Sequence, residues 1–139
     1  MGRYEFFDHV ADVGMRIRAD SPQDLFLTAA QALMAWVGPP PEGRTLEDKL
    51  AVEAEDREEL LVRWLQEILC RFHLDHAYLT GARDLTVDLE RRRIEASILS
   101  KIWDEEKRNN YQEVKAITYH QLRIEQQGSE WLAAVILDI

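Results

Sequence analysis

The chain has 139 residues, and its 17 lysines and arginines against 26 aspartates and glutamates give a formal charge of −9. Hydrophobic residues make up 46% and charged residues 31%, which is the balance of a globular domain. This length predicts one domain, residues 1–139. A single cysteine excludes an internal disulfide, and one thiol with 4 histidines is too sparse a ligand set for a zinc cage.

The sequence predicts a cytoplasmic protein. Its first residues, MGRYEFFDHV, lack the basic and then apolar organisation of a signal peptide. There is no apolar run of the length, about 18 residues, that a membrane-spanning helix needs. An acidic surface repels phosphate, so direct binding to nucleic acid is not expected. The basic run Arg91–Arg93 is predicted to be a solvated turn between two strands.

The first part of the chain predicts two strands followed by a helix. Residues 4–7 are aromatic and favour a strand, and residues 13–19 alternate between apolar and polar side chains, as a half-buried strand does. Ser21 then stands at the N-cap position and Pro22 at the first helical position. The glycine and prolines of residues 38–41 end this helix.

A third strand and a second helix follow. Residues 49–55 alternate and predict a strand with one wet face. Asp56 and Glu59 form a capping box, and an amphipathic pattern continues to about Leu74. Cys70 is predicted at the edge of the apolar stripe, as a small buried or half-buried thiol without chemistry.

The remainder of the chain is predicted to be mostly β. Residues 84–90 and 94–103 form a hairpin, residues 104–110 a charged loop, and residues 113–125 a long alternating strand. The last strand, residues 131–139, is apolar on both faces almost to its end and therefore reads as an interior strand. The order of elements predicts an α+β fold: a largely antiparallel sheet system with two amphipathic helices packed on it.

The carboxylates near the end of the chain are the strongest candidates for a functional site. Asp138 stands next to the terminal carboxylate of Ile139, and two neighbouring carboxylates repel unless a lysine, backbone N–H groups or a metal ion compensates them. Together with Asp12 they offer an all-oxygen ligand set that suits a hard cation such as Ca²⁺ or Mg²⁺. The alternative is a solvated, frayed chain end. His9, near Asp12, is either part of such a site or a packed histidine of the core.

Lys115 is the third candidate. It lies in the predicted strand 113–125, on the face of Glu113, Ile117 and Tyr119. A lysine in an apolar strand can pair with a carboxylate or reach a phosphate or an acidic group of a partner. The alternative is an edge lysine that prevents association between sheets. The sequence holds no nucleophile, phosphate-loop or zinc-protease motif, which makes an independent enzyme the weaker hypothesis.

Separate segments of the chain together resemble one family, the archeases. They are residues 4–14 (YEFFDHVADVG), 58–72 (EELLVRWLQEILCRF), 113–122 (EVKAITYHQL) and 135–139 (VILDI). The resemblance covers essentially the whole chain and is carried by the order and spacing of these segments. One departure is Val10, which stands where the family usually has threonine, so a hydroxyl near Asp12 is lost.

The resemblance implies a non-enzymatic accessory protein. Archeases assist an RtcB-type RNA ligase in tRNA splicing or RNA repair, by promoting ligase guanylylation and multiple turnover. The family's metal-binding positions correspond to Asp12, Asp138 and Ile139, the last through its main chain or terminal carboxylate. The ion would be Ca²⁺, with Mg²⁺ and Mn²⁺ as other candidates. Lys115 matches a functionally important lysine of the family, and His9 lies in the same motif as Asp12.

Two other functions stay open. One is a chaperone-like modulator of a tRNA-modifying enzyme such as a tRNA cytosine methyltransferase, a role also linked to some archeases. It would depend on apolar surface more than on an ion. The other is a metal-dependent hydrolase built on His9, Asp12 and Asp138, which would need a pocket and a placed general base that the sequence does not show.

Overall fold

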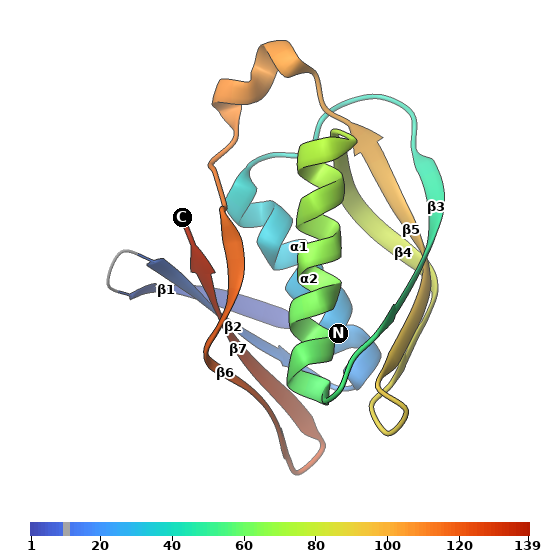
Figure 1. Ribbon diagram of the computed structural model, residues 1–139, viewed down its shortest axis with the longest axis vertical. Coiled ribbons are helices and arrows are strands. Elements are labelled where there is room, and N and C mark those ends of the chain that lie inside the picture. The colour runs from blue at the N-terminus through green and yellow to red at the C-terminus, as the bar shows by residue number, and fades with distance from the viewer. Residues whose placement is uncertain (10–11) are drawn as a thin grey trace.

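Figure 1 shows the computed structural model, which describes residues 1–9 and 12–139. The described residues form seven strands, two α-helices and one 3-10 helix. In chain order these are β1 (Arg3–His9), β2 (Asp12–Ala19), α1 (Pro22–Val37), β3 (Leu46–Glu53), α2 (Arg57–Leu74), β4 (Ala77–Asp88), β5 (Arg93–Ile102), η1 (Glu105–Asn110), β6 (Ala116–Gln127) and β7 (Glu130–Asp138).

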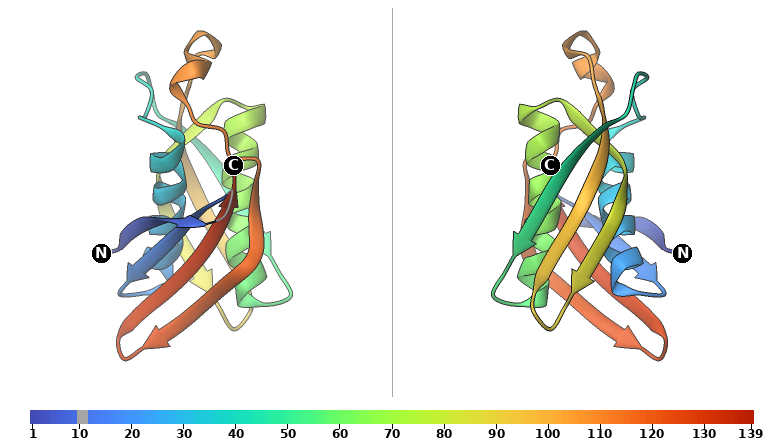
Figure 2. Two further views of the ribbon diagram at one scale, coloured as in Figure 1. Left: turned by 90° about the vertical axis from the view of Figure 1, so that its left-hand side faces the viewer. Right: turned by 90° about the vertical axis from the view of Figure 1, so that its right-hand side faces the viewer.

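The strands form two sheets with both helices between them (Figures 1 and 2). The four-stranded sheet has the order β1-β2-β7-β6 and the three-stranded sheet the order β3-β5-β4, and all of these pairings are antiparallel. The predicted α+β fold is thus confirmed. No helix of the described residues is long and apolar enough to cross a membrane.

Local capping signals set the helix boundaries. Ser21 accepts a hydrogen bond from the Asp24 N–H at 3.1 Å, and Asp56 accepts one from the Glu59 N–H at 2.7 Å. The Glu59 carboxylate reaches back to the N–H of Glu55, one residue earlier than in the standard capping box. Most residues of α1 are buried because this helix packs against both sheets.

The expected burial of Cys70 is wrong, because this residue is exposed. In a helix, residues four and seven apart share a face, and Cys70 therefore lies on the side of Gln66 and Arg63. Both of these are exposed as well, while Ile68 and Leu69 point into the core. The thiol is thus on the solvent side of α2.

Two predicted boundaries in the middle of the chain need correction. β3 begins at Leu46 rather than residue 49, and β4 begins at Ala77 rather than residue 84. The register of β4 shifts between Arg83 and Thr86, and Asp84 has a φ of 51°. This bulge interrupts the alternation that would have revealed the whole strand.

The basic turn and the charged loop also differ from expectation. The turn comprises residues 89–92, whereas Arg93 belongs to β5 and pairs with Glu53 and Glu95. The predicted loop 104–110 contains the 3-10 helix η1, which begins where the Asp104 carboxylate accepts a hydrogen bond from the Glu106 N–H. The side chains of η1 are all on the surface, so no apolar periodicity marks it.

The long alternating strand is only partly confirmed. β6 begins at Ala116, and its pairing with β7 shifts between Thr118 and Arg123, where Gln121 has a φ of 53°. Ile117 and Ile124 are both buried, although an unbroken strand would put them on opposite faces. Lys115, expected inside this strand, precedes it.

The expectation of an interior last strand is confirmed. β7 lies between β2 and β6, and the turn at Gly128, with a φ of 62°, connects it to β6. β7 therefore makes ladder contacts on both edges along its length. Its final residue in the ladder is Asp138.

Candidate functional site

The ends of the four strands meet in one row of the four-stranded sheet. His9 is opposite Asp12 across β1 and β2, Asp12 is opposite Asp138 across β2 and β7, and Ala116 is opposite Asp138 across β6 and β7. Directly opposed residues have Cβ atoms roughly 4.5–5.5 Å apart and share a face. The structure thus brings together two candidates far apart in the sequence, Asp12 and Asp138, with the His9 backbone beside them.

The opposed aspartates carry like charges at a partly covered position. Both are half-buried, and Ile139, which follows Asp138 at the chain end, is 39% exposed. Like charges facing each other across a ladder repel, and partial burial strengthens the repulsion. No group of three His, Cys, Asp or Glu side chains among the described residues is arranged to hold a metal ion. For a cation here, we expect from the sequence a further ligand from the main chain or the terminal carboxylate of Ile139.

Lys115 lies at the same end of the sheet. Its backbone N–H donates a hydrogen bond to the carbonyl oxygen of Asp138 at 2.7 Å, directly before β6 begins at Ala116. The lysine is therefore next to the aspartate in space. This differs from the sequence expectation, in which Lys115 shared a strand face with Ile117 and Tyr119.

The segment before Lys115 is fixed to both helices. The Gln112 N–H donates to the Val37 carbonyl at 2.7 Å, and Gln112 Nε2 donates to the Trp36 carbonyl at 2.8 Å. His73 Nε2 lies 3.2 Å from the Val114 carbonyl oxygen, to which it donates. The sequence reasoning missed Gln112 and His73, since their partners are 76 and 41 residues away and no local pattern marks such contacts.

The 3-10 helix upstream is held over Trp103. The guanidinium of Arg108 lies 5.2 Å from the centre of that ring, and Arg108 also pairs with Glu105. The hydrogen bond from Arg108 lowers the pKa of the Glu105 carboxyl. His76 stacks on the same indole with centroids 4.0 Å apart, and its Nε2 is 3.3 Å from Glu105. These contacts anchor the start of the segment that leads to Lys115.

A mostly apolar row, two residues further along the strands, supports the site from the same face of the sheet. Phe7, Gly14, Ile136 and Thr118 are successive partners across the four strands. A Cβ at Gly14 would lie 2.1 Å from the Phe7 ring, so glycine is required for the ring to lie there. The guanidinium carbon of Arg16 lies 4.0 Å from the centre of the Phe7 ring. Ile136 is only 1% exposed although it is on the face of the sheet that points away from the helices.

The comparisons with known proteins agree with this fold. A family model described as the Archease protein family matches residues 4–139. The chain belongs to the archease family. Protein archease of Sulfolobus acidocaldarius is 31% identical over 143 residues, and that of Thermococcus gammatolerans 33% identical over 149 residues. Each of these alignments covers 100% of both chains.

Two solved structures share the archease fold. The solution structure of protein 1598 from Methanobacterium thermoautotrophicum has a TM-score of 0.72 and 25% identity, with 98% of each chain covered. The crystal structure of an archease from Thermotoga maritima, described as a possible chaperone, has a TM-score of 0.68 and 18% identity and covers 96% of this chain and 94% of that one. The resemblance inferred from the sequence is thus confirmed.

The roles of the individual site residues stay predictions. Asp12, Asp138, Ile139 and the Lys115 backbone occupy one end of the sheet, which is consistent with one shared site. Val10, where a threonine was expected, lies outside the described residues, as does the side chain of His9.

Proposed function

We propose that this chain is a non-enzymatic accessory protein that activates an RtcB-type RNA ligase by promoting ligase guanylylation and multiple turnover, in tRNA splicing or RNA repair. The observation that supports this most is the register of β2 and β7, in which Asp12 stands opposite Asp138. This pair is at the end of strands β2 and β7, and Ile139 beside it is 39% exposed, which leaves surface for a partner.

A divalent cation fits the chemistry of this end of the sheet. The ligands would be the carboxylates of Asp12 and Asp138 with the main chain or terminal carboxylate of Ile139. Such oxygen donors suit Ca²⁺, Mg²⁺ or Mn²⁺. Because Ca²⁺ takes about 6–8 ligands, these residues alone would leave coordination positions for water or for groups of a partner. When bound, the ion would supply positive charge that acts in trans at the ligase.

Two further residues have supporting roles in this proposal. Lys115, attached through its N–H to Asp138, contributes a cation beside the acidic pair and contacts the ligase. His9, opposite Asp12 in the ladder, belongs to the same end of the sheet. Neither residue is given a catalytic step, because the chemistry of RNA joining belongs to the ligase and its GTP.

The deciding experiment measures ligase–GMP formation by a cognate RtcB-type ligase, with labelled GTP and Mg²⁺ or Mn²⁺. The reaction is run with and without a substoichiometric amount of this protein. We expect a clear acceleration, which would be weaker with Lys115→Ala. An unchanged rate, with a ligase shown to be competent, would contradict the proposal. Full stimulation by Lys115→Ala would remove only the contact role of the lysine.

A second candidate function is a chaperone-like modulator of a tRNA-modifying enzyme, such as a tRNA cytosine methyltransferase. It is favoured by the description of the Thermotoga maritima relative as a possible chaperone. Light scattering by such an enzyme on heating, with and without this protein and a chelator, separates the two functions. Protection that persists with chelator and with Asp138→Ala would favour the chaperone.

A further inference from the structure

The strand β1 is the least covered strand of the four-stranded sheet. It lies at the rim, and the N-terminus projects beyond the body of the molecule beside it (Figure 2). The four successive residues 3–6 are all exposed, whereas a strand packed on one face alternates between exposed and buried. Within the part of the chain that the structure describes, β2 is the one strand that pairs with β1.

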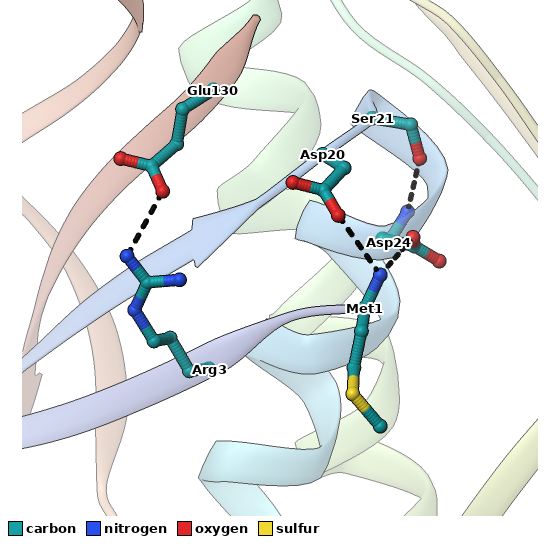
Figure 3. Close-up of polar contacts among 6 residues, drawn as sticks. All are labelled: Met1, Arg3, Asp20, Ser21, Asp24 and Glu130. Carbon is teal, nitrogen blue, oxygen red and sulfur yellow. Dashed lines mark hydrogen bonds and ion pairs between the residues drawn. The ribbon is translucent and has the colours of Figure 1, made fainter.

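The start of β1 is nevertheless held firmly in place. The Met1 ammonium is 3.0 Å from Asp24 and 3.3 Å from Asp20, at the N-terminal end of α1 (Figure 3). Arg3 donates to Glu130 at 2.9 Å, which connects β1 to β7 across β2. Contacts to α1 and to β7 thus hold the first residues of β1 in place. The free edge of β1 is therefore an ordered strand edge to which another strand can pair.

The outer face of β1 carries alternating charge. Arg3 and Glu5 point to this face, where Arg3 pairs with Glu130 and Glu5 pairs with Arg16 at 3.2 Å. The helix-facing side of β1 carries two exposed rings, Tyr4 at 43% and Phe6 at 37%, with centroids 5.5 Å apart. An isolated edge therefore leaves both backbone groups and aromatic surface in water.

Antiparallel pairing of two β1 strands around a two-fold axis offers three central registers. If Glu5 is at the centre, two Glu5 carboxylates oppose each other, which is unfavourable. If Phe6 is at the centre, Glu5 is opposite Phe7, and no residue meets a partner of opposite charge among those whose side chains the structure describes. If Tyr4 is at the centre, Arg3 of each copy is opposite Glu5 of the other, and Phe6 is opposite Gly2.

We propose that β1 is the interface of a homodimer, in which two copies pair antiparallel about Tyr4 and join their four-stranded sheets into one. The complementary charges of Arg3 and Glu5 select this register. On the outer face the ion pairs already present would continue across the axis, from Glu130 through Arg3 to Glu5 and Arg16 of the second copy. On the other face the Tyr4 rings of the two copies meet.

Sedimentation velocity of the full chain across a wide range of concentration tests the proposal. We expect a reversible monomer–dimer equilibrium. Either Arg3→Glu or Glu5→Arg turns two opposite-charge pairs into like-charge pairs and should raise the dimer dissociation constant by about tenfold or more. The double variant Arg3→Glu/Glu5→Arg restores the pairs with reversed sign and should dimerise close to the level of the wild type.

A matched control is Arg83→Glu, because Arg83 is also an arginine of a strand with a side chain 68% exposed and a glutamate partner, as Arg3 is. Its dimer dissociation constant should not change. Glu130→Gln, which removes the partner of Arg3 within one copy, should also leave dimerisation intact. Circular dichroism checks that every variant is folded.

Two results would overturn the proposal. One is a wild-type chain that remains monomeric up to its solubility limit. The other is a dimer in which Arg3→Glu and Glu5→Arg have no effect, or in which the double variant is no better than the single ones. Hydrogen exchange gives an independent reading, because amides at the free edge of β1 should become protected as the dimer forms.

Discussion

The two ends of the β2–β7 ladder carry opposite electrostatic arrangements. At one end Asp12 and Asp138, two like charges, face each other. At the other end Glu130 lies between Arg18 at 2.8 Å and Arg3 at 2.9 Å, so opposite charges meet. The same pair of strands therefore places two like charges opposite each other at one end and a glutamate between two arginines at the other.

This difference separates residues that fit stability from residues that fit a ligand. The pairs of Glu130 follow the ordinary rule that opposite charges stabilise cross-strand neighbours, although exposed pairs contribute only about 0–1 kcal/mol. Arg3 and Arg18 also stand opposite each other in the ladder, but Glu130 pairs with both, whereas at the other end the register places two aspartates opposite each other. Local departures from the rules of stability are typical of functional sites, and a cation between the carboxylates would turn the repulsion into attraction.

The largest effect is expected from breaking the acidic end. Asp138→Ala and Asp12→Ala should each abolish stimulation of ligase–GMP formation, because either one removes a ligand from the proposed cation. The fold should remain, since both residues are only half-buried at strand ends. The measurement is the guanylylation rate with labelled GTP, together with a thermal melt of each variant.

The matched control for that experiment is Glu130→Ala, which removes a carboxylate from the opposite end of the same two strands. Stimulation should persist with this variant. If Asp12→Ala or Asp138→Ala stimulates as fully as the wild type, the metal role of this end is wrong. If Glu130→Ala also abolishes stimulation, the two ends do not differ in function.

Divalent cations should stabilise the acidic end specifically. A ligand that binds only the folded state, present at about 100 times its dissociation constant, raises the free energy of unfolding by about 2.7 kcal/mol. We expect Ca²⁺, Mg²⁺ or Mn²⁺ to raise the melting temperature of the wild type in this way. With Asp138→Asn the increase should disappear, while the stability without cation should be equal or slightly higher because the repulsion is removed.

A chelator and the Asp138→Asn variant serve as controls for this measurement. Excess chelator should return the wild-type melting temperature to its starting value. An equal cation response of Asp138→Asn and the wild type would show that the ion binds elsewhere on an acidic chain.

The apolar row between the two ends should be sensitive to added volume. Gly14→Ala places a Cβ where the structure leaves 2.1 Å to the Phe7 ring, so the ring must move. Overpacking of this kind costs about 1–3 kcal/mol of stability. Urea unfolding measures the loss. Gly81→Ala is the control, because the nearest side-chain atom there is Leu99 Cδ1 at 4.0 Å and no steric cost is expected.

How far the sequence predicts this fold depends on how local each determinant is. The start of α1 at Pro22 and that of α2 at Arg57 were predicted because Ser21 and Asp56 bond to groups within three residues. Strand β2 was predicted because apolar and charged residues alternate from Met15 to Ala19. By contrast, the bulges near Asp84 and Gln121 have residues other than glycine at positive φ. The residue types at these positions therefore do not predict the bulges.

The candidate site shows the same limit. Asp138 stood out in the sequence because a charged residue ends a strand that is otherwise apolar. Its pairing with Asp12 depends on the register of two strands from opposite ends of the chain, which periodicity alone does not determine. The attachment of Lys115 to the Asp138 carbonyl is a backbone contact, and a sequence pattern carries no signal for it.

The smallest effect is expected at the basic end. Glu130→Gln removes the charge that Arg3 and Arg18 share but keeps most of the side-chain volume. The Glu130 side chain is 30% exposed and its partners are more exposed still, so the loss should be below about 1 kcal/mol. Because exposed pairs are screened by ions, urea unfolding at low and at high salt should give a difference that shrinks toward zero as salt rises. A loss of several kcal/mol that persists at high salt would mean that Glu130 stabilises the sheet by more than its ion pairs, and the contrast between the two ends would then no longer be one of charge alone.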